Sequence, residues 1–211
     1  MPVNVFAANQ KNNIPLDIVL VLDVSGSMED PITSTDTTKR IKILKDSINQ
    51  FIEEFAKNNS KQSDEKYQSR ISIIKFAGDK SDKVGNDTYT ENRYRYNYTQ
   101  IMNDFFTATN DNKAKLEDVV NSISPAGATR SDFAMELALS PPIIYEIIVN
   151  FPLSISQTVS HSTEMSSAEW DAKRIVFFVT DGQPTTLNNF DDDVANKAIT
   201  ASEEIKKDAE V

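Results

Sequence analysis

The sequence predicts an α/β fold: a doubly wound, Rossmann-like, mostly parallel sheet flanked by helices. Two unbroken apolar runs, at residues 18–22 and 175–179, have the continuous hydrophobicity of strands that are covered on both faces. Strand and helix patterns alternate along the chain, as crossover connections between parallel strands require. An aspartate, Asp23 or Asp181, follows each run. Polar side chains are therefore expected at the carboxyl edge of the sheet, where folds of this class bind ligands.

The first part of the chain has the pattern strand, helix, strand. After the first apolar run, hydrophobic residues recur at helical spacing over 39–57, and Thr37 or Thr38 is expected to cap that helix. A polar link over 58–68 leads to a second strand at 71–76. The helix is expected to pack its apolar face against the sheet.

The segment 79–98 is polar and rich in tyrosine, with Tyr94, Tyr96 and Tyr98 at alternate positions. A long loop of this composition is typical of a contact surface. Alternate tyrosines equally suit one face of a β-hairpin strand, so both interpretations stay open. A short strand is expected to follow near 99–106.

A helix expected at 112–123 is followed by a loop of small residues over 125–132, which leads into a further helix at 133–139. Small residues allow a backbone to approach another group closely. Thr129 lies where this loop meets the helix, and its hydroxyl can either cap the helix or ligate a cation.

Residues 141–171 mix short apolar pieces with Ser/Thr-rich sequence and are interpreted as an insertion. The final segment, 191–210, has apolar residues at helical spacing and acidic residues in its first turn, which predicts a helix. The whole chain, 1–211, is thus expected to form a single domain with insertions at about 79–98 and 141–171.

Composition limits the function. The 211 residues suffice for one domain with a substantial core, and 22 basic against 32 acidic residues give a net charge of -10. This charge disfavours nucleic-acid and anionic-membrane surfaces as partners. The absence of cysteine excludes disulfides and thiolate zinc sites. No apolar run reaches transmembrane length, so we expect no direct membrane insertion, and any export signal would lie outside this sequence.

The segment Asp23-Val24-Ser25-Gly26-Ser27 carries the clearest chemistry. Its three oxygen-bearing side chains, Asp23, Ser25 and Ser27, alternate along the chain, and Gly26 permits a tight turn. Residues two apart in an extended or gently curved loop point the same way, so the three oxygens can converge. One carboxylate and two hydroxyls suit a hard divalent cation such as Mg2+ or Mn2+.

With Thr129 in GATRSD and Asp181 in VTDGQPT, this segment resembles the metal-ion-dependent adhesion site of the von Willebrand factor type A (VWA) domain. That site has an Asp-x-Ser-x-Ser first loop, a threonine in a second loop and an aspartate in a third. The resemblance covers nearly the whole chain. The stretches DIVLVLDVSGSM, GATRSD and FFVTDGQPT look most like bacterial surface members, among them the tip adhesins of Gram-positive pili.

The resemblance implies a metal site made of Asp23, Ser25, Ser27, Thr129 and Asp181. The hydroxyls of Ser25, Ser27 and Thr129 would ligate the metal directly, while Asp23 and Asp181 would act mainly through water and hydrogen bonds. Mg2+ is the expected ion, with Mn2+ or Ca2+ as substitutes. An open coordination position would accept a carboxylate from a protein partner, possible examples being host extracellular matrix proteins. A metal that merely orders the three loops is the alternative.

Two settings fit such a module. The first is a bacterial cell-surface or pilus adhesin, which would be extracellular. The second is a cytoplasmic VWA domain that assembles or regulates an ATPase complex. The lack of cysteine and the tyrosine-rich insertion favour the surface setting. The sequence predicts no oligomeric state.

The chain departs from the VWA pattern in two ways. The family's sheet normally continues beyond the last helix, so we expect the domain to lack its C-terminal strand or strands, as a fragment or as a truncated product. The insertions at 79–98 and 141–171 are either arms around the metal face or decoration remote from it.

We expect no enzymatic activity. The single histidine, His161, has no HExxH motif around it, and neither a G-x-S-x-G elbow nor a phosphate-binding GxxxxGK[ST] loop occurs. The Asp23 motif has serines where a phosphatase would need a second carboxylate.

Overall fold

The protein folds around a four-stranded sheet with the strand order β5-β2-β1-β6. The computed structural model describes residues 14–78, 88–139, 172–186 and 189–208. Strand β1 pairs in parallel with β2 and with β6, whereas β5 runs antiparallel to β2. The prediction of a mostly parallel α/β sheet is therefore confirmed. The strands span Leu16–Asp23 (β1), Arg70–Phe76 (β2), Gln100–Thr107 (β5) and Lys173–Val179 (β6).

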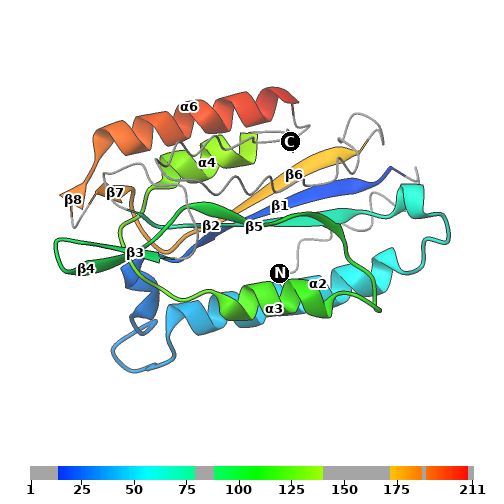
Figure 1. Ribbon diagram of the computed structural model, residues 1–211, viewed down its shortest axis with the longest axis horizontal. Coiled ribbons are helices and arrows are strands. Elements are labelled where there is room, and N and C mark those ends of the chain that lie inside the picture. Colours follow the sequence, from blue (N-terminus) through cyan, green and yellow to red (C-terminus); the bar gives the residue numbers. More distant parts are fainter. Residues whose placement is uncertain (1–13, 79–87, 140–171, 187–188, 209–211) are drawn as a thin grey trace, which may run out of the picture.

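Helices cover both faces of this sheet (Figure 1). Helices α2 and α3 pack on one face, and α4 packs on the other with α6 against it. From β1 the chain proceeds to β2 on one side and later returns to β6 on the other, so the winding direction reverses at β1. Among the described residues, no helix is both long and apolar enough to cross a membrane. The helices span Arg40–Asn59 (α2), Ala114–Ser122 (α3), Ser131–Leu139 (α4) and Asp192–Asp208 (α6).

Strand β1 lies at the centre of the hydrophobic core, and all its residues are buried. Its alternate side chains point to opposite faces. Leu20 and Leu22 join a cluster with the apolar residues of α2 and α3, whereas Val19 and Val21 pack with Ala134 of α4. This double burial explains why β1 is hydrophobic at consecutive positions.

A buried ion pair fixes the register at the start of the sheet. Asp17 of β1 faces Arg70 of β2, whose Nε and Nη2 both donate to the carboxylate at 2.8 Å. Both side chains are almost fully buried. Loss of one partner would leave an uncompensated buried charge, so this pair ties β1 firmly to β2.

Residues 88–97 form an antiparallel β-hairpin, which confirms one of the two interpretations of the tyrosine-rich segment. Strands β3 (Thr88–Glu91) and β4 (Tyr94–Asn97) are joined by Asn92 and Arg93, both with positive φ (49° and 73°). Two consecutive left-handed residues are typical of a type I′ turn. Residues 79–87 and the 141–171 insertion lie outside the described residues.

Several predicted boundaries differ from the structure. The prediction of Thr37 or Thr38 as the cap of α2 is wrong, because Lys39 occupies that position and makes no side-chain capping bond. The backbone before it is tied into a loop instead, where Ile32 N donates to Thr38 O at 3.1 Å. Four short elements were not predicted, because they are too short to show a hydrophobic period. They are η1 (Gly26–Glu29), η2 (Glu65–Tyr67), β7 (Thr185–Thr186) and β8 (Asn189–Phe190).

Candidate metal centre

Three loops meet at the carboxyl edge of the parallel strands, at the end of the molecule where η1, β7 and the β3–β4 hairpin lie (Figure 1). Asp23 is the last residue of β1, and Ser25 precedes the short helix η1. Because η1 turns the chain back, the hydroxyls of Ser25 and Ser27 lie 3.1 Å apart. The predicted convergence of the Asp-x-Ser-x-Ser side chains is thus present in the fold.

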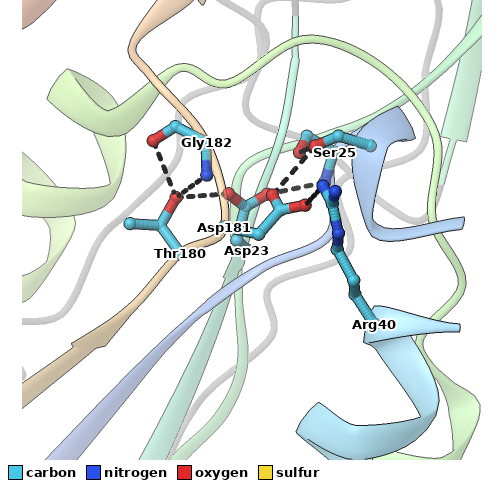
Figure 2. Close-up of polar contacts among 7 residues, drawn as sticks. Asp23, Ser25, Arg40, Thr180, Asp181 and Gly182 are labelled. Atoms are coloured by element: carbon cyan, nitrogen blue, oxygen red, sulfur yellow. Dashed lines mark hydrogen bonds and ion pairs between the residues drawn. The ribbon is translucent and has the colours of Figure 1, made fainter. Parts of the chain in front are cut away.

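Asp23 is fully buried, and hydrogen bonds hold both of its carboxylate oxygens (Figure 2). Oδ1 accepts a bond from Ser25 N at 2.8 Å, and Oδ2 accepts one from Thr180 Oγ1 at 2.6 Å. Burial raises the pKa of the Asp23 carboxyl above its usual value, whereas the hydrogen bonds from Ser25 and Thr180 oppose that rise. Asp23 therefore orients two loops rather than facing solvent.

Asp181 joins the third loop to the first loop and to helix α2. Its Oδ1 accepts a hydrogen bond from Ser27 Oγ at 2.8 Å, and its Oδ2 accepts one from Arg40 Nη1 at 2.6 Å. The Asp181 side chain is 14% exposed, and Figure 2 shows the Arg40 side chain extending from α2 toward it. Both oxygens of Asp181 thus have donors within the protein.

The hydroxyls of Thr129 and Ser27 both lie beside Gly182. A Cβ atom built on Gly182 would lie 3.7 Å from Thr129 Oγ1 and 3.8 Å from Ser27 Oγ. The lack of a side chain at Gly182 therefore leaves space next to both hydroxyls. Helix α4 begins at Ser131, two residues after Thr129, and Ser131 N donates to the Thr129 backbone carbonyl at 3.0 Å.

Backbone hydrogen bonds clamp the small-residue loop against its neighbours. Gly26 N donates to Gly127 O at 2.8 Å, and Ala128 N donates to the carbonyl of Gly78 at 2.6 Å. Gly127 has φ +110°, and a Cβ there would approach a ring carbon of Tyr96 to 3.1 Å. A side chain at position 127 would be strained and crowded, which explains the glycine there.

Asn97, at the end of the hairpin, forms a second clamp. Its buried Nδ2 lies 2.7 Å from Ser124 O and 3.2 Å from the carbonyls of Val24 and Ala126. Asn97 N also donates to Ala126 O at 3.0 Å. The hairpin is therefore anchored to both the first and the second loop of the site.

The fold brings all five predicted site residues to one edge of the sheet, and it adds three that sequence reasoning missed. The missed residues are Arg40, Asn97 and Thr180. Thr180 directly precedes Asp181 at a strand end, and this position was a usable signal. Arg40 and Asn97 had no local signal, because their partners lie far away in the sequence.

The donor set suits a hard divalent cation. It offers the hydroxyls of Ser25, Ser27 and Thr129 together with the carboxylates of Asp23 and Asp181. No group of three or more His, Cys, Asp or Glu residues that could hold a metal occurs within the described residues. A cation here would therefore have hydroxyl oxygens and few negative ligands, a set that fits Mg2+ and disfavours softer metals.

Comparison with known proteins gave structural matches only: no family model and no curated protein matches the chain. The pilus adhesin SpaC of Lactobacillus rhamnosus GG matches at 19% identity and a TM-score of 0.48, covering 82% of this chain and 16% of that one. The vWF domain of the type V pili tip protein Mfa5 of Porphyromonas gingivalis matches at 16% identity and a TM-score of 0.44, covering 82% and 39%. The PilB minor pilin of Streptococcus sanguinis matches at 14% identity and a TM-score of 0.39, covering 61% and 27%.

This chain therefore spans well under half the length of each of these three structures.

Proposed function

We propose that this chain is a binding module that attaches to a carboxylate-bearing protein partner through a divalent cation, with Mg2+ as the usual ion and Mn2+ or Ca2+ as substitutes. The observation that supports this most is that the hydroxyls of Ser27 and Thr129 both lie beside Gly182, with the Ser25 hydroxyl 3.1 Å from that of Ser27. These hydroxyls come from two loops far apart in the sequence. Such an arrangement is expected of a ligand set and has no evident role in packing.

The residues of the site favour an electron-poor cation. Asp23 is buried with donors on both carboxylate oxygens, and Asp181 likewise has a donor on each oxygen. These donors fix the orientation of both carboxylates, and Arg40 offsets part of the negative charge of Asp181. A bound Mg2+ would supply Lewis-acid attraction for an external carboxylate. The serine and threonine hydroxyls would hold the Mg2+ ion in place without cancelling the charge of the ion.

The β3–β4 hairpin is a suitable surface for further contacts with the partner. It lies at the same end of the molecule as the candidate centre (Figure 1), and Asn97 anchors it to the loops of that centre. Its tip exposes Arg93, Tyr94 and Arg95, and Tyr94 is 68% exposed. Arginine and tyrosine are enriched in protein interfaces, and the positive charges of Arg93 and Arg95 favour an acidic partner.

We further propose that the module acts at a bacterial surface, as part of a pilus or cell-wall adhesin. The resemblance of its three motifs to bacterial surface VWA domains supports this location. The binding role itself does not depend on it.

A peptide array tests the proposed function. Immobilised peptides with a central Asp or Glu, each matched to its Asn or Gln counterpart, are incubated with the protein in Mg2+ or in EDTA. We expect Mg2+-dependent binding to acidic peptides only, its loss in Thr129→Val, and its retention in Thr200→Val, a matched change on the exposed face of α6. Equal binding in EDTA, or equal binding to amide peptides, would refute a metal-bridged mechanism.

A further inference from the structure

The side chain of Arg40, at the start of helix α2, contacts the candidate centre at Asp181. Its Nη1 donates to Asp181 Oδ2 at 2.6 Å (Figure 2), and its side chain is 35% exposed. The guanidinium therefore lies at the rim of the site, one carboxylate away from the Ser27 hydroxyl.

The position of Arg40 is unfavourable for the helix that carries it. Arg40 is the first residue of α2, and α2 has no acidic residue in its first turn. A cation at a helix N-terminus opposes the helix dipole. Lys42, in the same turn, pairs with Asp46 on the outer surface of α2, whereas Arg40 reaches across to another loop. Helix stability does not explain an arginine here, but its contact with Asp181 does.

The contact determines what Asp181 can do. A carboxylate at this edge of the sheet could bind a cation directly and would then occupy the coordination position that a partner's carboxylate needs. In the structure, Ser27 holds one oxygen of Asp181 and Arg40 holds the other, at distances typical of charge-assisted hydrogen bonds. Each oxygen keeps a further lone pair, so these bonds do not block coordination by themselves. They fix the direction in which the Asp181 carboxylate points, and removal of Arg40 would free the carboxylate to turn.

We propose that Arg40 is a positioning residue that holds Asp181 out of direct metal coordination and so keeps one coordination position open for the partner. This inference rests on the proposed function. It predicts that loss of Arg40 strengthens metal binding, because Asp181 becomes an additional charged ligand. It also predicts that the same change removes a metal-bound water and weakens the capture of an external carboxylate. Loss of a residue that only stabilised the fold would leave the metal affinity unchanged or would weaken it.

The test combines calorimetric Mg2+ affinity with water-proton relaxation of the Mn2+-loaded protein, which reports metal-bound water. The variants are Arg40→Gln, Arg40→Lys, Asp181→Asn and the double variant Arg40→Gln/Asp181→Asn. Lys42→Gln serves as the control, because it removes one charge from the same helix turn without touching the site. The melting temperature of each variant in EDTA verifies folding.

We expect Arg40→Gln to bind Mg2+ about tenfold more tightly, since affinity at such sites follows the number of charged ligands. Its Mn2+ complex should lose relaxivity equivalent to one bound water. Arg40→Lys, which keeps the charge and a donor, should resemble the wild type, and Lys42→Gln should change affinity by less than about twofold because of screening. In the Asp181→Asn background, Arg40→Gln should produce no gain.

The other possible results distinguish a failure of this inference from a failure of the proposed function. Mg2+ binding by the wild type with unchanged or weaker binding by Arg40→Gln would overturn this inference and leave the proposed function intact. An equal gain in the Asp181→Asn background would also overturn it, because the effect would then be general electrostatics. No Mg2+ binding by the wild type would overturn the proposed function and this inference together.

Discussion

Asp23 is the residue on which the candidate centre depends most, because a buried carboxylate is costly unless donors surround it. Its donors are the backbone of Ser25 in the same loop and the hydroxyl of Thr180, which follows β6. Thr180 Oγ1 in turn accepts a bond from Gly182 N at 3.1 Å. A single hydroxyl therefore connects the first and third loops.

We predict that Thr180→Val destabilises the metal-free protein by about 1–3 kcal/mol, the cost of leaving a buried acceptor without its donor. Urea unfolding in EDTA measures this change. Thr180→Ser keeps the hydroxyl and should lose much less. Equal losses in both variants would mean that the methyl packing of Thr180 matters and its hydrogen bond does not.

Gly182 gives a prediction that separates metal binding from folding. An added Cβ would meet its neighbours at ordinary contact distances of 3.7 and 3.8 Å, so Gly182→Ala should fold with wild-type stability in EDTA. The methyl group would stand beside the Thr129 and Ser27 hydroxyls, so Mg2+ affinity should fall about tenfold or more. Calorimetry measures this affinity, and unchanged affinity would show that the cation does not use the space beside Gly182.

At the level of single residues, the sequence predicted which candidate ligands meet at the sheet edge better than it predicted the residues that hold them there. Asp23, Ser25 and Ser27 form a local pattern, and Thr129 and Asp181 each follow a recognisable structural signal. Arg40 could not be predicted, because its partner is Asp181, which only the fold brings near. The same holds for Asn97, whose acceptors lie in two other loops.

At the level of elements, hydrogen bonds from neighbouring elements hold the backbones of the loops of the centre. The backbone N–H of Thr185, in β7, donates to the carbonyl of Thr129 at 3.1 Å. In return, the backbone N–H of Thr129 donates to the Thr185 hydroxyl, also at 3.1 Å. Thr186 of the same short strand donates to Asp191, just before helix α6, at 2.8 Å. The N-terminus of α6 is therefore coupled to the loop that carries Thr129.

Asp191 carries a pH-dependent prediction. The Thr186 hydroxyl, followed by the backbone N–H groups of Val194 and Asp193, lowers the pKa of the Asp191 carboxyl below its usual value. A carboxyl with a lowered folded-state pKa stabilises the protein above the unfolded-state pKa of about 4, and this contribution is lost as pH falls through the folded-state value. Asp191→Asn should therefore lower the melting temperature at neutral pH by a few degrees.

The difference in melting temperature between wild type and Asp191→Asn should shrink as pH falls below about 4. Thermal unfolding across this pH range measures it, with Asp193→Asn as a control for loss of charge in the same helix turn. A difference that stays constant down to low pH would exclude ionisation of Asp191 as its cause.

Long helices and strands were predicted more accurately than short ones. The long helix α2 and the buried strands β1, β2 and β6 have clear periodicity or continuous apolar runs. The capping of α2 was mispredicted, because tertiary contacts of the preceding loop, and not capping propensity, determine where that helix begins. The hairpin remained one of two options, because alternate tyrosines suit both a strand and a contact surface.

At the scale of the whole molecule, the doubly wound topology is what creates the site. Strands β1 and β6 are neighbours in the sheet although they are far apart in the sequence, so Asp23 and the Thr180–Asp181 pair meet at one edge. This arrangement followed from the strand-helix alternation, and it was the most reliable prediction from sequence. The packing that excludes water from Asp23 was not predictable, because it requires the three-dimensional positions of all three loops.

Thermal unfolding with parallel calorimetry in Mg2+, Mn2+ and Ca2+ tests whether the hydroxyls beside Gly182 hold a divalent cation. Saturating Mg2+ should raise the melting temperature of the wild type by about 5–10 °C, as ligand at 100 times its Kd does for a domain of this size. Asp23→Ala and Thr129→Ala should lose this gain, whereas Thr200→Ala on α6 should keep it. No binding of any of the three ions at millimolar concentration, or an equal gain in Thr129→Ala, would show that these hydroxyls do not hold a cation.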